Sequence, residues 1–297
     1  MVVNKGIVRL EAAIRILGRE PIRKAKLEAL LVLLAGGKLN SALIEPIERQ
    51  QTRAKLLNLE ALGDEIGRNR VASQILFEAV IGKDDTLPRR FLSRGAQVAR
   101  SVGRIVVPVD NGEFLYGTGS LISTQLAITN NHVIDSVETA RDAVLELGYY
   151  DVEPNFPSSE RQVFAIDPDK FFYTNTTLDF TIIGIESQAD SVSTASYGAL
   201  DFILNSGKAL IGEGVNILHH AGGGPQRISI RENTLVDVFD NWIHYVSDTA
   251  PGSSGAPVFN DEWQLVAIHH ASLPWGDGLI VNEGIRISAI VKNLSSN

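Results

Sequence analysis

A serine set between two glycines, in the segment Asp248-Thr-Ala-Pro-Gly-Ser-Ser-Gly-Ala-Pro257, most constrains the fold of this chain. Gly252 and Gly255 lack side chains, so the backbone can turn tightly here and a substrate carbonyl can come close. Ser254 can act as a nucleophile only where a base takes its proton and donors receive the developing negative charge. The fold must therefore bring distant residues to this turn.

An upstream histidine is the candidate base. His132 follows the strand-like segment Leu126-Ala-Ile-Thr129, so its imidazole should lie at a strand end and face a cleft. The amides of Gly252 and Ser254 are the predicted oxyanion hole, where loss of one donor typically costs about 10²–10³ in rate.

An aspartate between these two segments is the candidate that orients the imidazole. Asp179 stands directly before the strand-like residues 180–185, and a carboxylate buried there needs a partner such as an imidazole N–H. Asp167 and Asp169 are alternatives, but no apolar strand follows them directly. We therefore select Asp179.

The chain from about residue 104 to residue 290 resembles the trypsin-like serine proteases, of the bacterial type that includes the glutamyl endopeptidases. The resemblance is carried by Gly117-Thr-Gly-Ser-Leu-Ile122, Thr129-Asn-Asn-His-Val133, Leu178-Asp-Phe180 and Gly252-Ser-Ser-Gly-Ala-Pro257. The order histidine, aspartate, serine is that of chymotrypsin. The resemblance implies an all-β protease domain of two six-stranded antiparallel β-barrels. His132 and Asp179 would come from the first barrel and Ser254 from the second.

This family implies a serine endopeptidase that hydrolyses protein or peptide substrates through a catalytic triad and an acyl-enzyme, without a cofactor. Ser253 stands where animal digestive proteases carry an aspartate that pairs with a newly cleaved amino terminus. We therefore expect no such zymogen switch. Two alternatives stay open: a trypsin-like barrel with an unused triad that acts as a binding or scaffold module, and an esterase or other acyl transferase.

The resemblance also assigns two substrate-binding residues. Thr249 and His269 match positions that contact the substrate carboxylate in glutamyl endopeptidases, which predicts a preference for glutamate before the scissile bond. Those secreted enzymes also use a processed amino terminus, whereas about ninety residues precede the barrel here. The alternative role for His269 is that of a hydrogen-bonded core residue on a strand.

Adjacent histidines occur twice, as His219-His220 and His269-His270. Neighbours on a strand point to opposite faces, so neither pair can easily chelate one ion. The sequence also lacks cysteine and a His-Glu-x-x-His motif. We predict no metal site.

The first hundred residues have the apolar spacing of helices, over residues 7–17, 27–34, 56–66 and 71–80. They predict a small helical bundle over residues 1–88, with a boundary in residues 83–88, and a protease domain over residues 89–297. A helix over 91–102 would lead into the first strand. Proteases of this type resemble effectors joined to helical adapter domains in defence or signalling systems. We therefore hypothesise that residues 1–88 recruit an adapter or regulator.

Charge is divided unevenly along the chain. Residues 1–100 hold 18 Lys and Arg against 11 Asp and Glu, whereas the remainder holds 9 against 24. This asymmetry indicates a nucleic-acid contact, a docking surface between the halves, or solvated helix faces. We favour solvated faces and expect no nucleic-acid partner.

Three further features bear on the compartment. The 297 residues include no cysteine, which favours a reducing environment. The amino terminus lacks the pattern of a signal peptide, and the longest apolar run, residues 29–37, is far shorter than the roughly 18 residues of a membrane span. We predict a cytoplasmic protein without a membrane partner.

Overall fold

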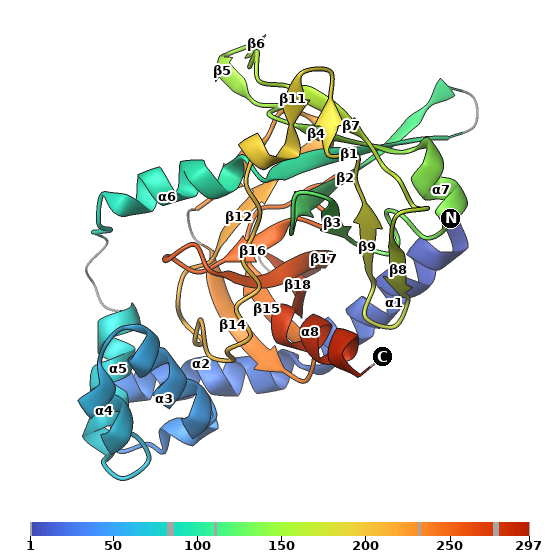
Figure 1. Ribbon diagram of the computed structural model, residues 1–297. Helices are drawn as coiled ribbons and strands as arrows, with labels where there is room; N and C mark the ends of the chain where they lie inside the picture. The colour runs from blue at the N-terminus through green and yellow to red at the C-terminus, as the bar shows by residue number, and fades with distance from the viewer. Residues whose placement is uncertain (1, 82–85, 110–111, 231–232, 276–278, 297) are drawn as a thin grey trace.

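The computed structural model describes residues 2–81, 86–109, 112–230, 233–275 and 279–296, and shows an amino-terminal helical region followed by two β-barrels (Figure 1). The predicted fold class, an all-β chymotrypsin-like protease domain behind a helical region, is confirmed. The helices before the barrels are α1 (Val2–Gly18), α2 (Glu20–Leu34), α3 (Ile47–Leu56), α4 (Glu60–Glu65), α5 (Arg70–Ile81) and α6 (Arg90–Ala99).

One helix prediction needs correction. The apolar spacing over residues 56–66 predicted a continuous helix, but α3 ends at Leu56 and α4 begins at Glu60. Asn58 between them has φ +58°, a left-handed conformation that ends an α-helix and that asparagine tolerates better than most residues. Within the described part of the chain, no helix is long and apolar enough to cross a bilayer.

The first barrel is built on an antiparallel sheet with strand order β7-β4-β1-β2-β3-β9-β8. An isolated bridge between Ile166 and Ile185, just beyond the ends of β7 and β9, closes the six strands from β7 to β9 into a ring. β8 is a seventh strand paired with β9. The strands are β1 (Val102–Pro108), β2 (Phe114–Leu121), β3 (Leu126–Thr129), β4 (Val144–Leu147), β7 (Gln162–Ala165), β8 (Phe172–Asn175) and β9 (Phe180–Gly184).

The second barrel repeats this arrangement with strand order β13-β12-β16-β17-β18-β15-β14. A bridge between Gly214 and Thr234 closes the six strands from β12 to β14, and β13 is the additional strand. The strands are β12 (Asn216–His219), β13 (Arg227–Ser229), β14 (Thr234–Phe239), β15 (Trp242–Val246), β16 (Pro257–Phe259), β17 (Leu265–Trp275) and β18 (Leu279–Arg286).

Short elements complete the fold. They are the 3-10 turns η1 (Ser41–Leu43), η3 (Thr194–Ser196) and η4 (Ala221–Gly223), the helices α7 (Val137–Asp142) and α8 (Ile287–Ser295), and the two-stranded pairs β5 (Asp151–Glu153) with β6 (Phe156–Pro157) and β10 (Gln188–Ala189) with β11 (Val192–Ser193).

The helical region shares a hydrophobic core with the second barrel. Leu33 and Phe77 of the helices belong to one buried cluster with Ile211, Ile217 and Tyr245 of the barrel. The helices therefore bury their apolar faces against the barrel as well as against each other. The division of the chain at residue 88 stays a prediction, and residues 83–85 of the predicted boundary lie outside the described residues.

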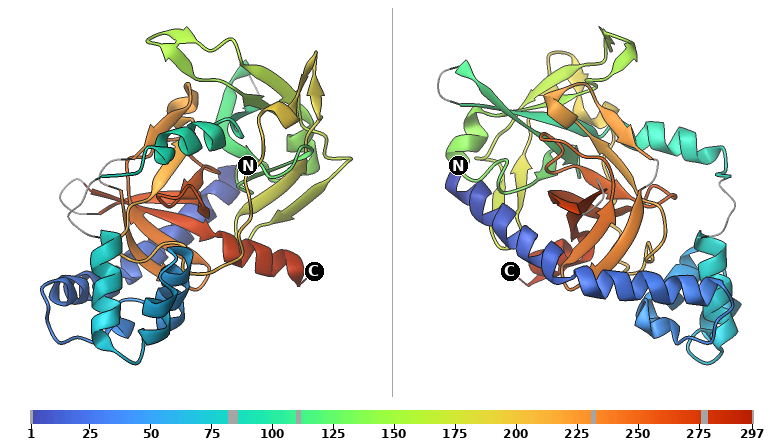
Figure 2. Two further views of the ribbon diagram at one scale, coloured as in Figure 1. Left: turned by 60° about the vertical axis from the view of Figure 1, so that its left-hand side comes forward. Right: turned by 180° about the vertical axis from the view of Figure 1, so that it is seen from behind.

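Charged pairs join the same two parts. Arg19 and Lys26 contact Asp237 at 2.6 and 2.7 Å, and Arg53 contacts Glu213 at 2.6 Å. Figure 2 shows α1 and α2 lying along the second barrel. These basic residues therefore form a docking surface between the two halves of the chain. For them the preferred interpretation, solvated helix faces, is wrong, because their carboxylate partners are almost fully buried.

Candidate active site

The turn that carries Ser254 is tied to both barrels. The Thr118 amide donates to the Ser254 carbonyl and the Thr118 hydroxyl to the Gly252 carbonyl, both at 2.8 Å, which fixes the turn to β2. The Gly255 amide donates to the His269 carbonyl at 2.9 Å, which fixes it to β17. Ser254 is half-buried. The nucleophile candidate thus lies where the two barrels meet.

Both bracketing glycines are required by the backbone. Gly252 has φ +97° and Gly255 has φ +87°, and a Cβ atom at Gly255 would lie 2.1 Å from the Thr118 carbonyl oxygen. In the described part of the chain, neither the Gly252 amide nor the Ser254 amide has a hydrogen-bond acceptor. Both N–H groups are therefore free to serve as the predicted oxyanion donors.

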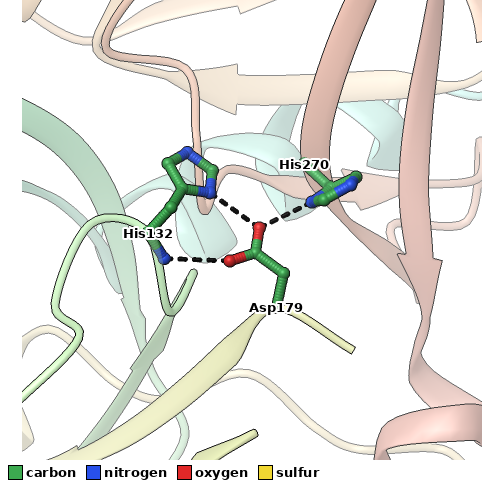
Figure 3. Close-up of side chains that lie close together, drawn as sticks. All are labelled: His132, Asp179 and His270. Carbon is green, nitrogen blue, oxygen red and sulfur yellow. Dashed lines mark hydrogen bonds and ion pairs between the residues drawn. The ribbon is translucent and has the colours of Figure 1, made fainter. Parts of the chain in front are cut away.

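Asp179 holds His132 by two hydrogen bonds (Figure 3). The His132 amide donates to Asp179 Oδ1 at 2.9 Å, and His132 Nδ1 lies 2.7 Å from Asp179 Oδ2. Asp179 has φ +51° directly before β9, and its carbonyl accepts a hydrogen bond from the Asn130 side chain at 2.9 Å. This double contact sets the imidazole orientation and places its proton on Nδ1, which leaves Nε2 as the basic nitrogen.

The alternative aspartates have other partners. Asp167 contacts Lys170 at 3.0 Å, and Asp169 contacts Arg141 at 2.6 Å. The Asp169 side chain is largely exposed and the Asp167 side chain is partly exposed. The structure brings Asp179 to His132, as the sequence predicted.

His270 is a residue of the site that sequence reasoning missed. Its Nδ1 lies 2.6 Å from Asp179 Oδ2, the oxygen that also contacts His132 (Figure 3). The rings of the two histidines are 6.3 Å apart. Strand alternation was the available signal, because a neighbour of His269 on β17 must point to the opposite face.

The two flanking histidines determine the charge of Asp179. Burial alone would raise its pKa, but His132 and His270 hold that pKa well below the usual range, so the carboxylate is ionised. Burial alone would lower the pKa of His270, but Asp179 and Glu283 raise it to about 9. His270 is therefore an imidazolium at neutral pH.

The candidate base and the candidate nucleophile are not in contact: among the residues that the structure describes, no hydrogen bond joins His132 to Ser254. Catalytic hydrogen bonds are often long without substrate and tighten when it binds. In the described part of the chain, the contact between His132 and Asp179 is thus already formed, whereas a contact between His132 and Ser254 is not.

Ser253 has an internal partner. Its hydroxyl lies 2.7 Å from His219 Nδ1 and accepts a hydrogen bond from the Ala250 amide at 3.2 Å. Burial lowers the pKa of His219 to about 4, so this imidazole is neutral. The position of the activation aspartate in digestive proteases is here part of a neutral, buried contact.

The two predicted specificity residues have separate hydrogen-bond partners on the second barrel. The Thr249 hydroxyl donates to Asn282 Oδ1 at 2.6 Å, and His269 Nδ1 lies 2.7 Å from the Tyr245 hydroxyl. Asn282 pairs with Tyr245 across β18 and β15, so the two contacts are adjacent. Burial lowers the pKa of His269 to about 3, so its ring is neutral.

One group of side chains could offer ligand atoms to a metal ion. His132, Asp179 and His270 place such atoms within 4.8 Å of one another. Both histidines direct Nδ1 at one Asp179 oxygen, so an ion would have to displace two short hydrogen bonds. The absence of a metal site stays a prediction.

The members of each histidine pair have different partners: Ser253 for His219, Gly224 for His220, Tyr245 for His269 and Asp179 for His270.

Solved protease structures share this fold. The active form of the Rv3671c protease of M. tuberculosis matches with a TM-score of 0.51 at 15% identity, over 73% of this chain and 89% of that one. A serine endoprotease of Yersinia pestis matches with a TM-score of 0.53 at 13% identity, over 71% and 67%.

Two curated proteins are similar in sequence. The uncharacterized protein y4fB of Sinorhizobium fredii is 40% identical over 212 residues, which is 67% of this chain and 32% of that protein. The secreted RxLR effector protein 73 of Plasmopara viticola is 26% identical over 189 residues, 59% of this chain and 45% of that protein. The chain thus spans about a third and under half of the length of these relatives.

The family match covers the segments on which the site is built. Residues 117–268 match the family described as a trypsin-like peptidase domain, a stretch that includes His132, Asp179 and Ser254. It runs from the middle of β2 into β17 and so takes in strands of both barrels. With about half of its length in this match, the chain belongs to the trypsin-like peptidase domain family.

Proposed function

We propose that this chain is a serine endopeptidase in which Ser254 is the nucleophile, His132 the general base and Asp179 the residue that orients it. The observation that carries the proposal is the double hydrogen bond from His132 to Asp179, next to a glycine-bracketed serine anchored to both barrels. Family membership supports a peptide or protein substrate.

The proposed reaction follows from this geometry. His132 Nε2 accepts the Ser254 hydroxyl proton as the oxygen attacks the scissile carbonyl carbon, and the Gly252 and Ser254 amides stabilise the oxyanion. The imidazolium then protonates the leaving amine. Water hydrolyses the acyl-enzyme by the same proton transfers and releases Ser254. Asp179, ionised and buried, stabilises the imidazolium at each step.

Labelling with a fluorophosphonate tests the triad, because the reagent requires an activated serine. We expect one modified residue in the wild type, mapped to Ser254 by mass spectrometry, and none in Ser254→Ala. Turnover of peptides by that variant should fall by about 10⁶-fold, by analogy with a comparable triad. Near wild-type turnover in Ser254→Ala would refute the proposal.

A binding or scaffold module is the second candidate, favoured by one observation. Among the described residues, His132 and Ser254 share no hydrogen bond. Absence of labelling in a correctly folded wild type would favour this candidate over the peptidase.

A preference for glutamate before the scissile bond is a finer proposal. Neutral His269 can donate one hydrogen bond to a substrate carboxylate. Asn282 Nδ2 donates to the Ser247 carbonyl at 2.7 Å, so its Oδ1 faces Thr249 and accepts a hydrogen bond from the Thr249 hydroxyl. Thr249 would have to turn from Asn282 to the substrate to act as a second donor.

Glutamine is the matched control substrate for this preference, since it has the same length without the charge. Higher kcat/KM for glutamyl than for glutaminyl peptides, reduced in Thr249→Val, would support the proposal. The opposite order would contradict glutamate specificity and leave the triad proposal intact.

An effector role is a further proposal, supported by the name of the Plasmopara relative. Expression of the wild type and of Ser254→Ala in the same cells tests it. A cellular response that requires Ser254 is expected, and identical responses to both proteins would contradict a proteolytic effector.

A further inference from the structure

A helix far from the nucleophile in sequence reaches the candidate active site through an arginine. Arg15 of α1 clamps Glu283 of β18, with Nε 3.0 Å from Oε2 and Nη2 2.7 Å from Oε1. Its guanidinium also lies 4.1 Å above the Trp242 ring. α1 runs beside β17 and β18 (Figure 2). This contact is therefore both a bidentate ion pair and a stacked cation.

Glu283 continues the contact to the triad residues. Its Oε1 lies 3.4 Å from His270 Nε2, while His270 Nδ1 lies 2.6 Å from Asp179 Oδ2. The same Asp179 oxygen contacts His132 Nδ1 at 2.7 Å. An unbroken series of contacts thus runs from Arg15 to the imidazole of the proposed base. Except for Arg15, every side chain in it is buried.

The charges in this series balance. Asp179 and Glu283 are anions, and His270 and Arg15 are cations. Without Glu283, imidazolium His270 would compete with His132 for the Asp179 charge that stabilises the proposed imidazolium of His132. Without Arg15, the fully buried Glu283 would keep the contact of its Oε2 with His244 Nε2 at 3.1 Å, but it would lose its bidentate partner and the hydrogen bond that fixes Oε1 beside His270.

We propose that Arg15 is a positioning residue for catalysis: through Glu283 and His270 it holds Asp179 in the orientation that His132 requires, so α1 completes the active site. This inference rests on the proposed function, because it takes His132 as the base. The amino-terminal helix α1, which packs against β17 and β18 of the second barrel, then contributes to activity without contacting substrate.

The chain offers a closely matched control. Arg19, one turn after Arg15, pairs with Asp237 at 2.6 Å and lies 3.9 Å above the Phe239 ring. Both arginine side chains are 24% exposed and both carboxylate partners are 0% exposed. In the described part of the chain, the Asp237 carboxylate pairs with Arg19 and Lys26 and does not contact the triad residues. Loss of Arg19 therefore removes a similar ion pair and leaves the contacts from Arg15 to His132 in place.

The test compares Arg15→Ala, Arg15→Lys and Arg19→Ala with the wild type. Two readouts are measured: the rate of fluorophosphonate labelling, and the ¹H NMR resonances of the His132 and His270 Nδ1 protons, identified with His270→Gln. For Arg15→Ala we expect labelling about 10-fold to 100-fold slower, the range for a lost hydrogen bond to a charged group, and displaced resonances. Arg15→Lys should recover part of the rate, and Arg19→Ala should match the wild type in both readouts.

Two results overturn the proposal. One is an Arg15→Ala protein with wild-type resonances and labelling rate. The other is an equal effect of Arg15→Ala and Arg19→Ala, which would indicate only general anchoring of the helices α1 and α2 on the barrel. Failure of the proposed function is recognised separately, by a folded wild type that is not labelled. The resonance comparison then still supports or overturns the coupling of Arg15 to the His132–Asp179 contact.

Discussion

Replacing His270 by glutamine should remove a contribution to stability that depends on pH. The ring lies between the Asp179 and Glu283 carboxylates, with Arg15, His132 and the Trp242 ring around it. Burial lowers the pKa of His270, but the two carboxylates raise it from 6.5 to about 9 in the folded protein. The native state therefore binds this proton more tightly than the unfolded chain does.

The sign and size of the effect follow from that difference. The stabilisation is fully present below about pH 6.5 and is lost as the pH rises through about 9, because the folded protein then gives up the proton. A pKa raised from 6.5 to about 9 corresponds to about 3 kcal/mol in the free energy of unfolding. His270 is fully buried in its cluster, so solvent screening reduces this value little.

Urea unfolding of the wild type and of His270→Gln at pH values from 5.5 to 9 measures the effect. The difference in free energy of unfolding should shrink by about 3 kcal/mol across this range. His219, His220 and His269, with pKa values lowered to about 4, 4 and 3, destabilise both proteins as the pH falls below 6.5, so their effect cancels in the difference. A difference that does not change with pH, or that grows toward pH 9, would refute the reasoning.

Two further predictions concern the site and the core. Under the proposed function, Asp179→Asn should lower kcat by about 10⁴-fold in a peptide assay, because the His132 tautomer is no longer held, and a loss of less than tenfold would contradict the role of Asp179. Leu33→Ala should lower the free energy of unfolding by about 2–5 kcal/mol, because Leu33 is 0% exposed in the core that the helices share with the second barrel. Calorimetry should show one shifted transition for the helices and that barrel, whereas an unshifted second transition would argue against a shared core.

Local chemistry explains how much of the site could be predicted. Gly252 and Gly255 indicated a tight turn around Ser254 from the sequence alone. Both have positive φ angles, which only glycine readily adopts. His132 and Asp179 were placed at strand ends because the apolar segments next to them have clear β-patterning. The structure brings these two side chains together as expected.

The helices show where such patterning stops being informative. Apolar spacing predicted helical segments, but it could not show that Leu33 and Phe77 face a β-barrel. The same spacing ran through Asn58, where one residue in the left-handed region ends the helix. Periodicity describes one element at a time and carries no information about the surface that covers it.

By itself, the sequence predicted the fold class through its family resemblance, and it singled out Ser254, His132 and Asp179 as candidate site residues because they stand in short segments with strong local preferences. Only the tertiary structure decided the role of His270, the pairing of Arg15 with Glu283 and the docking of the basic helices. Arg15 and Glu283 are 268 positions apart, and no local rule relates them. Their contact exists because the barrel buries a carboxylate whose charge must be matched by a cation from another element.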